Sequence, residues 1–253
     1  MPKARTANVP ELDGRCAFFL DLDGTLLDIT DHPHHVSIDG DLVRLLEALG
    51  RAADGALAII SGRPAADIDR LLASPGFCVA GQHGAERRDF SGTMHKHAVP
   101  LAALQKARQR FEALAAKHAA LVLEDKGVNL ALHFRSAPQL RAEVLDAARA
   151  LAAELGGEFE VQLGKMVVEL RPSGKDKGVA IAEFLAEPPF KGRTPVFVGD
   201  DLTDEFGFAL INRVAGHSVK VGEGESAARW RLPDSAAVRA WLSAYVASAG
   251  GRA

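Results

Sequence analysis

The chain has 253 residues, of which 47% are hydrophobic and 25% are charged, and its formal net charge at pH 7 is −3. This is the composition of a globular protein with one large domain, or one domain that carries a smaller one. The slight acidic excess argues against nucleic acid or an anionic membrane as the main partner.

The sequence also predicts neither a signal peptide nor a membrane-spanning segment. No stretch approaches the roughly 20 apolar residues that span a bilayer, and the N-terminal residues have no apolar signal-peptide segment. Cys16 and Cys78 lie in apolar runs, which predicts buried free thiols. Such thiols suit a reducing compartment, so we expect a cytoplasmic protein.

Short apolar segments alternate with helical patterns in the first third of the chain. Residues 16–20 read as a strand buried on both faces, and strands ending in turns follow at 56–63 and 76–84. Helical spacing covers residues 41–53 and 64–74 between them. This alternation predicts a doubly wound parallel sheet.

The pattern changes after Gly84. The order becomes helix, hairpin, helix, hairpin, over residues 100–120, 121–135, 138–155 and 158–172. Antiparallel hairpins combined with helices predict an α+β module that is separate from the parallel sheet. We therefore expect an insert at residues 86–171.

The first pattern returns after Pro172. A helix is expected at 176–186, strands at 194–201 and 217–222, and a last helix near 235–247. The fold class is thus α/β, with a doubly wound core formed by residues 1–85 and 172–253.

Acidic residues follow two of the predicted buried strands. Ligands of open α/β sheets bind at the carboxyl ends of the strands, so these acids should converge. They are Asp21, Asp23, Asp200, Asp201 and Asp204. Five converging carboxylates repel one another unless a cation offsets them, and Mg²⁺ prefers such oxygen ligands together with a substrate phosphate. The sequence therefore predicts a Mg²⁺ site that binds a phosphate group.

The spacing of the first acidic pair suits phosphoryl transfer. One aspartate can attack phosphorus and form an acyl phosphate, and the other can protonate the leaving alcohol. Hydroxyl and cationic donors must surround the transferring oxygens, and Ser61, Arg63 and Lys177 are available. Lys177 begins a predicted helix, whose N-terminus favours an anion.

At this point the residues resemble a known family. Four motifs in order resemble those of haloacid-dehalogenase-superfamily phosphatases: DLDGT (21–25), ISGR (60–63), KDKG (175–178) and GDDLTDE (199–205). Further segments narrow the resemblance to the trehalose-6-phosphate phosphatase family: GQHGAE (81–86), LEDKGVNLALHFR (123–135) and VVELRPSGKDKG (167–178).

The resemblance implies a Rossmann-like core with a mobile cap inserted between the second and third motifs. It implies that Asp21 is the nucleophile and that Asp23 is the acid/base, with the Asp23 backbone carbonyl on Mg²⁺. Ser61 would hold the phosphoryl group, and Lys177 would neutralise the nucleophile and the phosphate.

The fourth motif would complete the metal site. The resemblance assigns Asp200 to the metal directly, and it assigns Asp201 and Asp204 to the same site from further out or through water. More than one assignment fits the last two residues.

Substrate selectivity should come from the insert. A disaccharide phosphate presents many hydroxyls, which require charged and amide partners rather than an apolar slot. With the resemblance, we expect sugar contacts from Lys126, His133, Glu169 and Arg171 in the insert. In the core, we expect Arg63 to bind the substrate near its phosphoryl group. The expected partner is a small-molecule substrate, and the expected state is a monomer or at most a weak homo-oligomer.

Two other readings stay open. The same chemistry could act on another sugar phosphate, such as a sucrose, glucosylglycerol or mannosylglycerate phosphate. Alternatively, the chain could bind a phosphosugar without turnover, although this would predict the loss of Asp21 or Asp23, and both are present.

Overall fold

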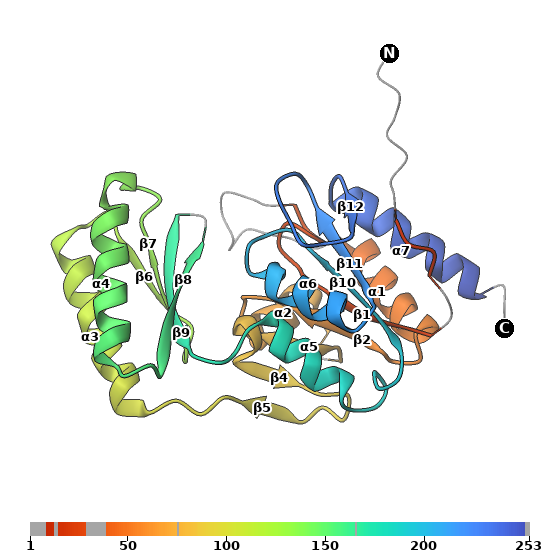
Figure 1. Cartoon of the computed structure of the whole chain (residues 1–253), viewed down its shortest axis with the longest axis horizontal. Helices are drawn as coiled ribbons and strands as arrows, with labels where there is room; N and C mark the ends of the chain where they lie inside the picture. The colour runs from red at the N-terminus through yellow and green to blue at the C-terminus, as the bar shows by residue number, and fades with distance from the viewer. Residues whose placement is uncertain (1–8, 13–14, 29–38, 75, 165, 251–253) are drawn as a thin grey trace, which may run out of the picture. The chain divides into compact units, whose positions relative to one another are not determined.

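The computed structural model of the chain describes residues 9–12, 15–28, 39–74, 76–164 and 166–250. Its contacts form two compact units (Figure 1). The first unit comprises residues 1–95 and 176–253, and the second comprises residues 96–175. Each unit has its own hydrophobic core.

An eight-stranded sheet forms the centre of the first unit, in the order β12-β11-β10-β1-β2-β3-β4-β5. Its strands are β1 (Cys16–Leu20), β2 (Leu57–Ile60), β3 (Cys78–Gly81), β4 (Glu86–Arg88), β5 (Met94–Lys96), β10 (Thr194–Gly199), β11 (His217–Val221) and β12 (Trp230–Leu232). Strand β1 pairs in parallel with β10 and β2, so that Leu20 lies opposite Val198 and Ile59. Every residue of β1 is buried, as expected for a parallel strand covered on both faces.

Helices cover both faces of this sheet. They are α1 (Gly40–Ala52), α2 (Ala65–Leu72), α5 (Lys177–Leu185), α6 (Asp204–Arg213) and α7 (Ser235–Gly250). Helix α1 packs against α7 and α5 packs against α6, and Figure 1 shows the two pairs on opposite faces. The predicted α/β class with a parallel, doubly wound core is therefore confirmed.

Some elements of the first unit were not predicted. Strands β4 and β5 fall inside the range assigned to the insert, and they extend the core sheet, with β4 antiparallel to β3. Strand β4 carries the charged residues of Glu86–Arg88, and Arg87 is buried between the Phe184 ring and the carboxylates of Glu183 and Glu187 of α5. Strand β5 is exposed, so neither strand has the apolar pattern of a core strand. Helix α6 and strand β12 were also missed.

The second unit is a four-stranded antiparallel sheet in the order β6-β7-β9-β8. Its elements are α3 (Leu101–Lys117), β6 (Val122–Asp125), β7 (Leu130–His133), α4 (Arg141–Glu154), β8 (Phe159–Gly164) and β9 (Val167–Pro172). Phe111 of α3 and Val144 of α4 are buried in one cluster with Leu132 and Leu170 of the sheet. The two helices therefore cover one face of this sheet.

Two other expectations concern the whole chain. Cys16 and Cys78 are buried free thiols, as predicted. In the part of the chain that the structure describes, no helix combines the length and the apolar character needed to cross a lipid bilayer.

Candidate active site

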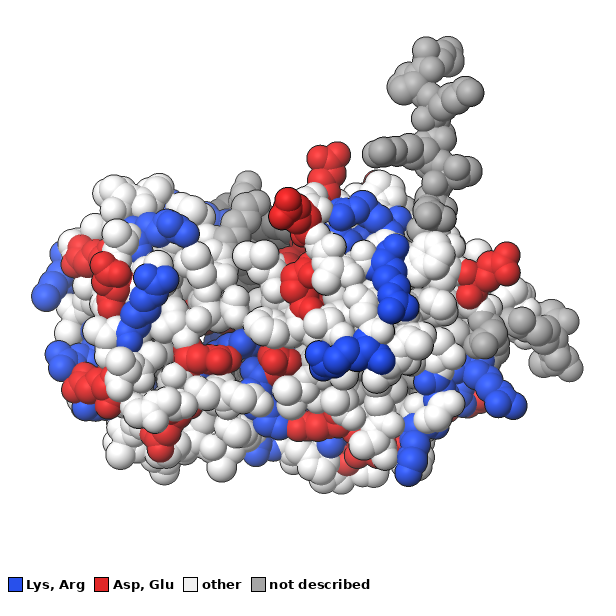
Figure 2. Space-filling view, viewed as in Figure 1, with Lys and Arg blue, Asp and Glu red and all other residues white. Residues whose placement is uncertain are grey.

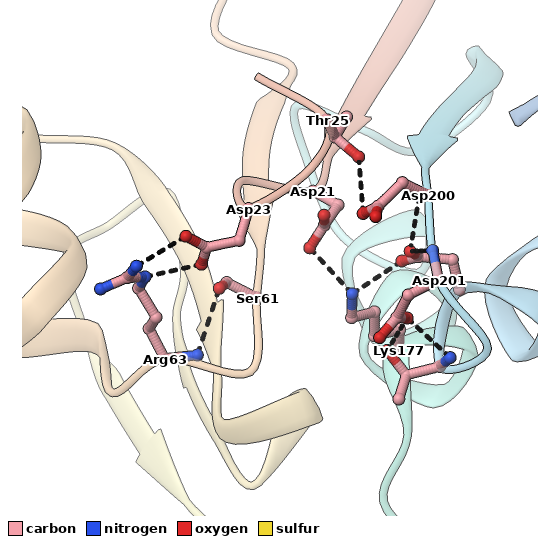
Figure 3. A network of polar contacts seen from close by, with 10 residues as sticks. Asp21, Asp23, Thr25, Ser61, Arg63, Lys177, Asp200 and Asp201 are labelled. Carbon is pink, nitrogen blue, oxygen red and sulfur yellow. Dashed lines mark hydrogen bonds and ion pairs between the residues drawn. The ribbon is translucent and has the colours of Figure 1, made fainter. Parts of the chain in front are cut away.

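The carboxyl ends of β1 and β10 bring predicted acids together (Figure 3). Asp21 directly follows β1, and its N–H donates to the Val198 carbonyl at 3.0 Å. Asp200 directly follows β10. One carboxylate oxygen from each of Asp21, Asp200 and Asp204 lies within 4.8 Å of the other two. These three residues are called the acidic cluster below.

Lys177 connects two members of the acidic cluster. Its Nζ donates to Asp21 Oδ1 at 2.8 Å and to Asp204 Oδ1 at 2.7 Å. All three side chains are buried. Lys177 is the first residue of α5, whose N-cap Asp176 accepts the Val179 N–H at 2.8 Å. The cap fixes the start of α5, and this fixes the origin of the lysine side chain.

The fourth motif forms a tight turn built on its own carboxylates. Asp204 Oδ2 accepts the N–H groups of Asp200 at 2.9 Å and Asp201 at 3.0 Å. Asp201 Oδ1 accepts the N–H and the hydroxyl of Thr203 at 2.7 and 2.6 Å. Asp204 thus both belongs to the acidic cluster and shapes the turn, whereas the Asp201 carboxylate lies outside the cluster.

The loop after β1 approaches this turn closely. Thr25 Oγ1 donates to Asp200 Oδ1 at 3.3 Å. Gly24 has φ +85°, and a Cβ at this position would lie 2.2 Å from Asp200 Oδ2. Only glycine satisfies both the left-handed backbone and the close approach.

Lys220 is a site residue that the sequence analysis missed. It lies in β11, is 7% exposed, and its Nζ donates to the backbone carbonyl oxygens of Asp200 and Val221. It brings a second buried cation next to the fourth motif. Its sequence signal is weak, because β11 (His217–Val221) contains other polar residues besides Lys220.

Burial raises the pKa values of all three carboxyl groups in the acidic cluster. Burial raises the pKa of Asp21 well above its ordinary value, with Lys177 opposing the shift. Burial and the charge of Asp204 raise the pKa of Asp200 to about 6. Burial also raises the pKa of Asp204, again opposed by Lys177. For Asp201 burial acts upward as well, but the charge of Lys177 and the Thr203 donors outweigh it and lower the pKa.

The donor set of the cluster fits a divalent metal ion. Asp21 Oδ2 is buried and has no hydrogen-bond partner among the described residues. Carboxylate oxygens with raised pKa values, close together and only partly neutralised by lysine, are suited to a hard cation such as Mg²⁺ or Ca²⁺.

A second group of predicted residues lies on the other side of Asp21 (Figure 3). The Asp23 carboxylate lies outside the acidic cluster and accepts two hydrogen bonds from the Arg63 guanidinium, each of 2.6 Å. Ser61 directly follows β2, is 1% exposed, and its Oγ accepts the Arg63 N–H at 3.1 Å. The first and second motifs therefore meet here.

The predicted sugar-binding residues share one face of the sheet in the second unit. The register places them on the face opposite the helices, since Leu132 and Leu170 point into the core. This face is called the open face below because neither helix of the second unit covers it, although Glu169 and Arg171 on it are buried. It carries two ion pairs, Lys126–Glu169 at 2.5 Å and Arg171–Glu160 at 2.8 Å, and a hydrogen bond between His133 and Glu124 at 2.8 Å. His133 faces away from its apolar neighbours, as the alternation predicted. Glu124 and Glu160 are part of this polar face, although they were not among the predicted site residues.

Comparison with known proteins identifies the family. The profile of the trehalose-phosphatase family matches residues 19–236. The chain belongs to the trehalose-phosphatase family. A protein of Escherichia coli (strain K12) described as trehalose-6-phosphate phosphatase is 45% identical over 233 residues, which are 92% of this chain and 87% of the relative. A probable trehalose-phosphate phosphatase of Sinorhizobium fredii is 39% identical, over 90% of this chain and 86% of the relative.

Solved structures agree with the fold of this trehalose-phosphatase family member. The C-terminal domain of Candida albicans trehalose-6-phosphate phosphatase aligns with a TM-score of 0.82 at 22% identity, covering 93% of both chains. A protein described as related to trehalose-6-phosphate phosphatase aligns with a TM-score of 0.76 at 26% identity, covering 93% of this chain and 99% of that one. The chain is therefore a phosphatase of the haloacid-dehalogenase type, as the motifs predicted, and its family implies a divalent metal and a sugar phosphate substrate.

Metal binding by this trehalose-phosphatase family member should depend on pH. The sequence predicts Asp200 as a metal ligand, and a carboxyl group in that role must lose its proton; burial and the charge of Asp204 raise its pKa to about 6. We expect the affinity for Mg²⁺ or Mn²⁺ to fall as the pH drops below about 6, with proton release on binding. Calorimetry in two buffers of different ionisation enthalpy measures both quantities. An affinity that stays constant between about pH 5 and pH 7 would exclude Asp200 as a ligand.

Proposed function

We propose that this phosphatase hydrolyses trehalose 6-phosphate to trehalose and inorganic phosphate, the last step of trehalose biosynthesis. The observation that carries the proposal is the Asp21 carboxylate, which belongs to the acidic cluster. Lys177 holds one of its oxygens, and the other is buried without a hydrogen-bond partner among the described residues. This arrangement leaves one oxygen available for attack on phosphorus. The names of the bacterial relatives support trehalose 6-phosphate as the substrate.

The proposed reaction has two steps, the formation of an acyl phosphate on Asp21 and its hydrolysis. In the first, an Asp21 carboxylate oxygen bonds to phosphorus, the bond from phosphorus to the sugar oxygen breaks, and Asp23 gives that oxygen a proton. In the second, Asp23 takes a proton from water, the water oxygen bonds to phosphorus, and the acyl phosphate bond to Asp21 breaks. Ser61 holds a phosphoryl oxygen, and Lys177 compensates charge on Asp21 and on the phosphoryl group.

The residues that would hold the metal come from two strand ends. We assign Mg²⁺ to the Asp21 and Asp200 carboxylates and the Asp23 backbone carbonyl, with Asp201 and Asp204 supporting the site. When bound, Mg²⁺ would supply positive charge that offsets the negative charge of the nucleophile and of the phosphoryl group. The acidic cluster supports this assignment, because three carboxylates lie close together and burial raises the pKa of Asp21 although Lys177 opposes the shift.

The second unit is assigned the role of a cap that selects the sugar. Its open sheet face carries Lys126, His133, Glu169 and Arg171, whose charged groups suit sugar hydroxyls. In the core, we keep Arg63 as a candidate for contact with the substrate. We place the enzyme in the cytoplasm, where buried free thiols persist, and we expect a monomer.

A substrate panel tests the proposed function. Phosphate release is measured with trehalose 6-phosphate, sucrose 6-phosphate, glucosylglycerol phosphate, mannosylglycerate phosphate and glucose 6-phosphate, each with Mg²⁺ and with EDTA. We expect the highest kcat/KM with trehalose 6-phosphate and no turnover in EDTA. A higher kcat/KM for another sugar would reassign the substrate, and full activity in EDTA would remove the metal from the reaction.

Replacing His133 with alanine should separate sugar recognition from chemistry. The side chain is 37% exposed on the open face, and losing one hydrogen bond to a neutral sugar hydroxyl costs about 0.5–1.5 kcal/mol. We therefore expect the kcat/KM for trehalose 6-phosphate to fall about 2- to 12-fold, and the kcat/KM for p-nitrophenyl phosphate to stay unchanged.

His118 provides the matched control for this variant. It pairs with Glu143 at 3.1 Å, is 30% exposed, and lies at the end of α3 away from the open face. His118→Ala should leave both substrates unchanged. Equal losses on the two substrates in His133→Ala would show that His133 has no part in sugar recognition.

A further inference from the structure

The pair formed by Arg63 and Asp23 joins the second motif to the predicted acid/base. Arg63 Nε donates to Asp23 Oδ2 and Nη2 donates to Oδ1, both at 2.6 Å. The side chains are 16% and 38% exposed. We infer that Arg63 is a positioning residue that orients the Asp23 carboxylate for proton transfer. This inference rests on the proposed function, in which Asp23 exchanges a proton with the sugar oxygen and with water.

The geometry of the pair fixes the plane of the carboxylate. A two-point contact from the planar guanidinium restricts rotation about the last bond of Asp23, which a single hydrogen bond does not. A carboxylate has about four lone-pair sites, and the guanidinium occupies two of them. The remaining sites stay available to a water molecule or a leaving oxygen. Asp23 can therefore serve in proton transfer while Arg63 holds it.

The backbone of Arg63 is itself held on both sides. Its N–H donates to Ser61 Oγ at 3.1 Å, and its carbonyl accepts the Gln82 N–H at 2.9 Å. The Ser61 carbonyl accepts the His83 N–H at 3.0 Å. The turn after β3 therefore binds the whole Ser61–Arg63 segment through main-chain hydrogen bonds, so the guanidinium projects from a fixed point.

The backbone of the turn after β3, which binds the Ser61–Arg63 segment, is itself strained. Gln82 and His83 are buried and have φ values of +49° and +58°, a region that costs about 1–3 kcal/mol for each residue with a side chain. A Cβ on Gly62 would lie 2.7 Å from the His83 ring, so the ring packs directly on the Ser61–Arg63 turn. Strain of this kind persists only where the surroundings enforce it. Residues 82–83 therefore hold the backbone of Arg63 in place, and the Arg63 guanidinium in turn holds the Asp23 carboxylate.

The positioning role differs from the substrate contact expected from the sequence. If Arg63 mainly binds the phosphate, its loss raises KM for every phosphate ester. If it mainly orients Asp23, its loss slows only the steps in which Asp23 moves a proton. Expulsion of p-nitrophenolate needs no proton, whereas expulsion of a sugar alkoxide and hydrolysis of the acyl phosphate both do. The two roles therefore have different kinetic signatures.

The experiment compares Arg63→Gln, Arg63→Lys, Asp23→Asn and the double variant Asp23→Asn/Arg63→Gln by stopped-flow and steady-state kinetics. We expect Arg63→Gln to lower kcat for trehalose 6-phosphate by about 10-fold or more, part of the roughly 10²–10⁴-fold that general acid–base catalysis supplies. KM should stay unchanged. With p-nitrophenyl phosphate, a fast burst of nitrophenolate should precede a slowed steady phase. In the Asp23→Asn background, Arg63→Gln should cause no further loss.

Arg88 supplies the matched control, because it makes the same two-point contact with Asp69, at 2.7 and 2.6 Å, in the same unit. Arg88→Gln should lower the thermal midpoint without creating a burst. Arg63→Lys, which keeps the charge but offers one contact, should fall between the wild type and Arg63→Gln. These variants separate the orientation of Asp23 from a general loss of stability.

Two outcomes would overturn the inference. One is a rise of KM that is equal for both esters, and the other is a loss that adds in full to that of Asp23→Asn. Neither outcome bears on the substrate itself. If the panel reveals a different preferred sugar phosphate, the same four variants are measured with that ester, so the proposed function can fail while the role of Arg63 is still decided.

Discussion

Asp21→Asn is expected to abolish phosphate release from every ester while the protein stays folded. The amide keeps the shape of the side chain and can still accept the hydrogen bond from Lys177, but it is not a nucleophile towards phosphorus. We expect a thermal midpoint within about 3 °C of the wild type, which is roughly 1 kcal/mol for a chain of this size. Phosphate release and differential scanning fluorimetry measure the two effects.

A phosphoryl mimic adds a second measurement to the Asp21 prediction. Beryllium fluoride with Mg²⁺ should raise the thermal midpoint of the wild type and not that of Asp21→Asn, because the mimic bonds to the carboxylate oxygen. Asp41→Asn serves as the control, since Asp41 is an exposed residue that pairs with Arg44 within α1. Residual turnover in Asp21→Asn that responds to Mg²⁺ would eliminate Asp21 as the nucleophile.

Lys177→Met is expected to cost both stability and activity. Lys177 is 3% exposed, and its removal leaves the buried carboxylates of Asp21 and Asp204 without their shared cation. Breaking a buried ion pair by removing one partner costs about 3–5 kcal/mol. Loss of a preorganised donor at the reacting group lowers kcat about 10²–10³-fold. Urea unfolding and initial rates with trehalose 6-phosphate test the two effects.

The instability of Lys177→Met should depend on pH in a defined direction. Asp21 and Asp204 already have raised pKa values in the folded state, and loss of the lysine raises them further. A group with a raised folded pKa favours folding when protonated, and this contribution is lost as the pH rises through the folded pKa. The deficit in the free energy of unfolding should therefore shrink from about pH 8 to about pH 5. A deficit that grows towards low pH would contradict the arrangement.

Lys106→Met is the control for the lysine variant. Lys106 is 46% exposed and pairs with Glu154 at 2.7 Å on the surface of the second unit. An exposed pair contributes about 0–1 kcal/mol, so this variant should unfold almost like the wild type. A similar loss in both variants would mean that removal of any paired lysine destabilises the chain.

The positions of Asp21 and Asp200 at neighbouring strand ends could be predicted from the sequence. Parallel strands buried on both faces are continuous apolar runs, and their carboxyl ends meet at one edge of the sheet. The runs before Asp21 and Asp200 are of this kind, and the two strands prove to be neighbours in parallel register. The alternation in residues 130–134 likewise predicted that His133 faces away from the core of the second unit.

Other parts of the site depend on partners that no sequence pattern reveals. Lys220 contacts main-chain carbonyls, which every residue has, so nothing in its neighbours indicates the contact. The pairing of Arg63 with Asp23 joins residues 40 positions apart, and it depends on a side-chain conformation. Strand β4 was missed because ion pairs bury its arginines, and hydrophobic periodicity does not detect such burial.

The left-handed turn after β3 sets a conflict for laboratory evolution of a more heat-resistant enzyme. Glycine adopts the φ values of Gln82 and His83 without strain, so a glycine at either position would relieve about 1–3 kcal/mol of backbone strain, a gain that a selection for thermal tolerance can exploit. Each such replacement would also remove a buried side chain from the turn that holds Ser61 and Arg63. A glycine at position 82 or 83 would therefore relieve strain in the folded enzyme but would lower its turnover.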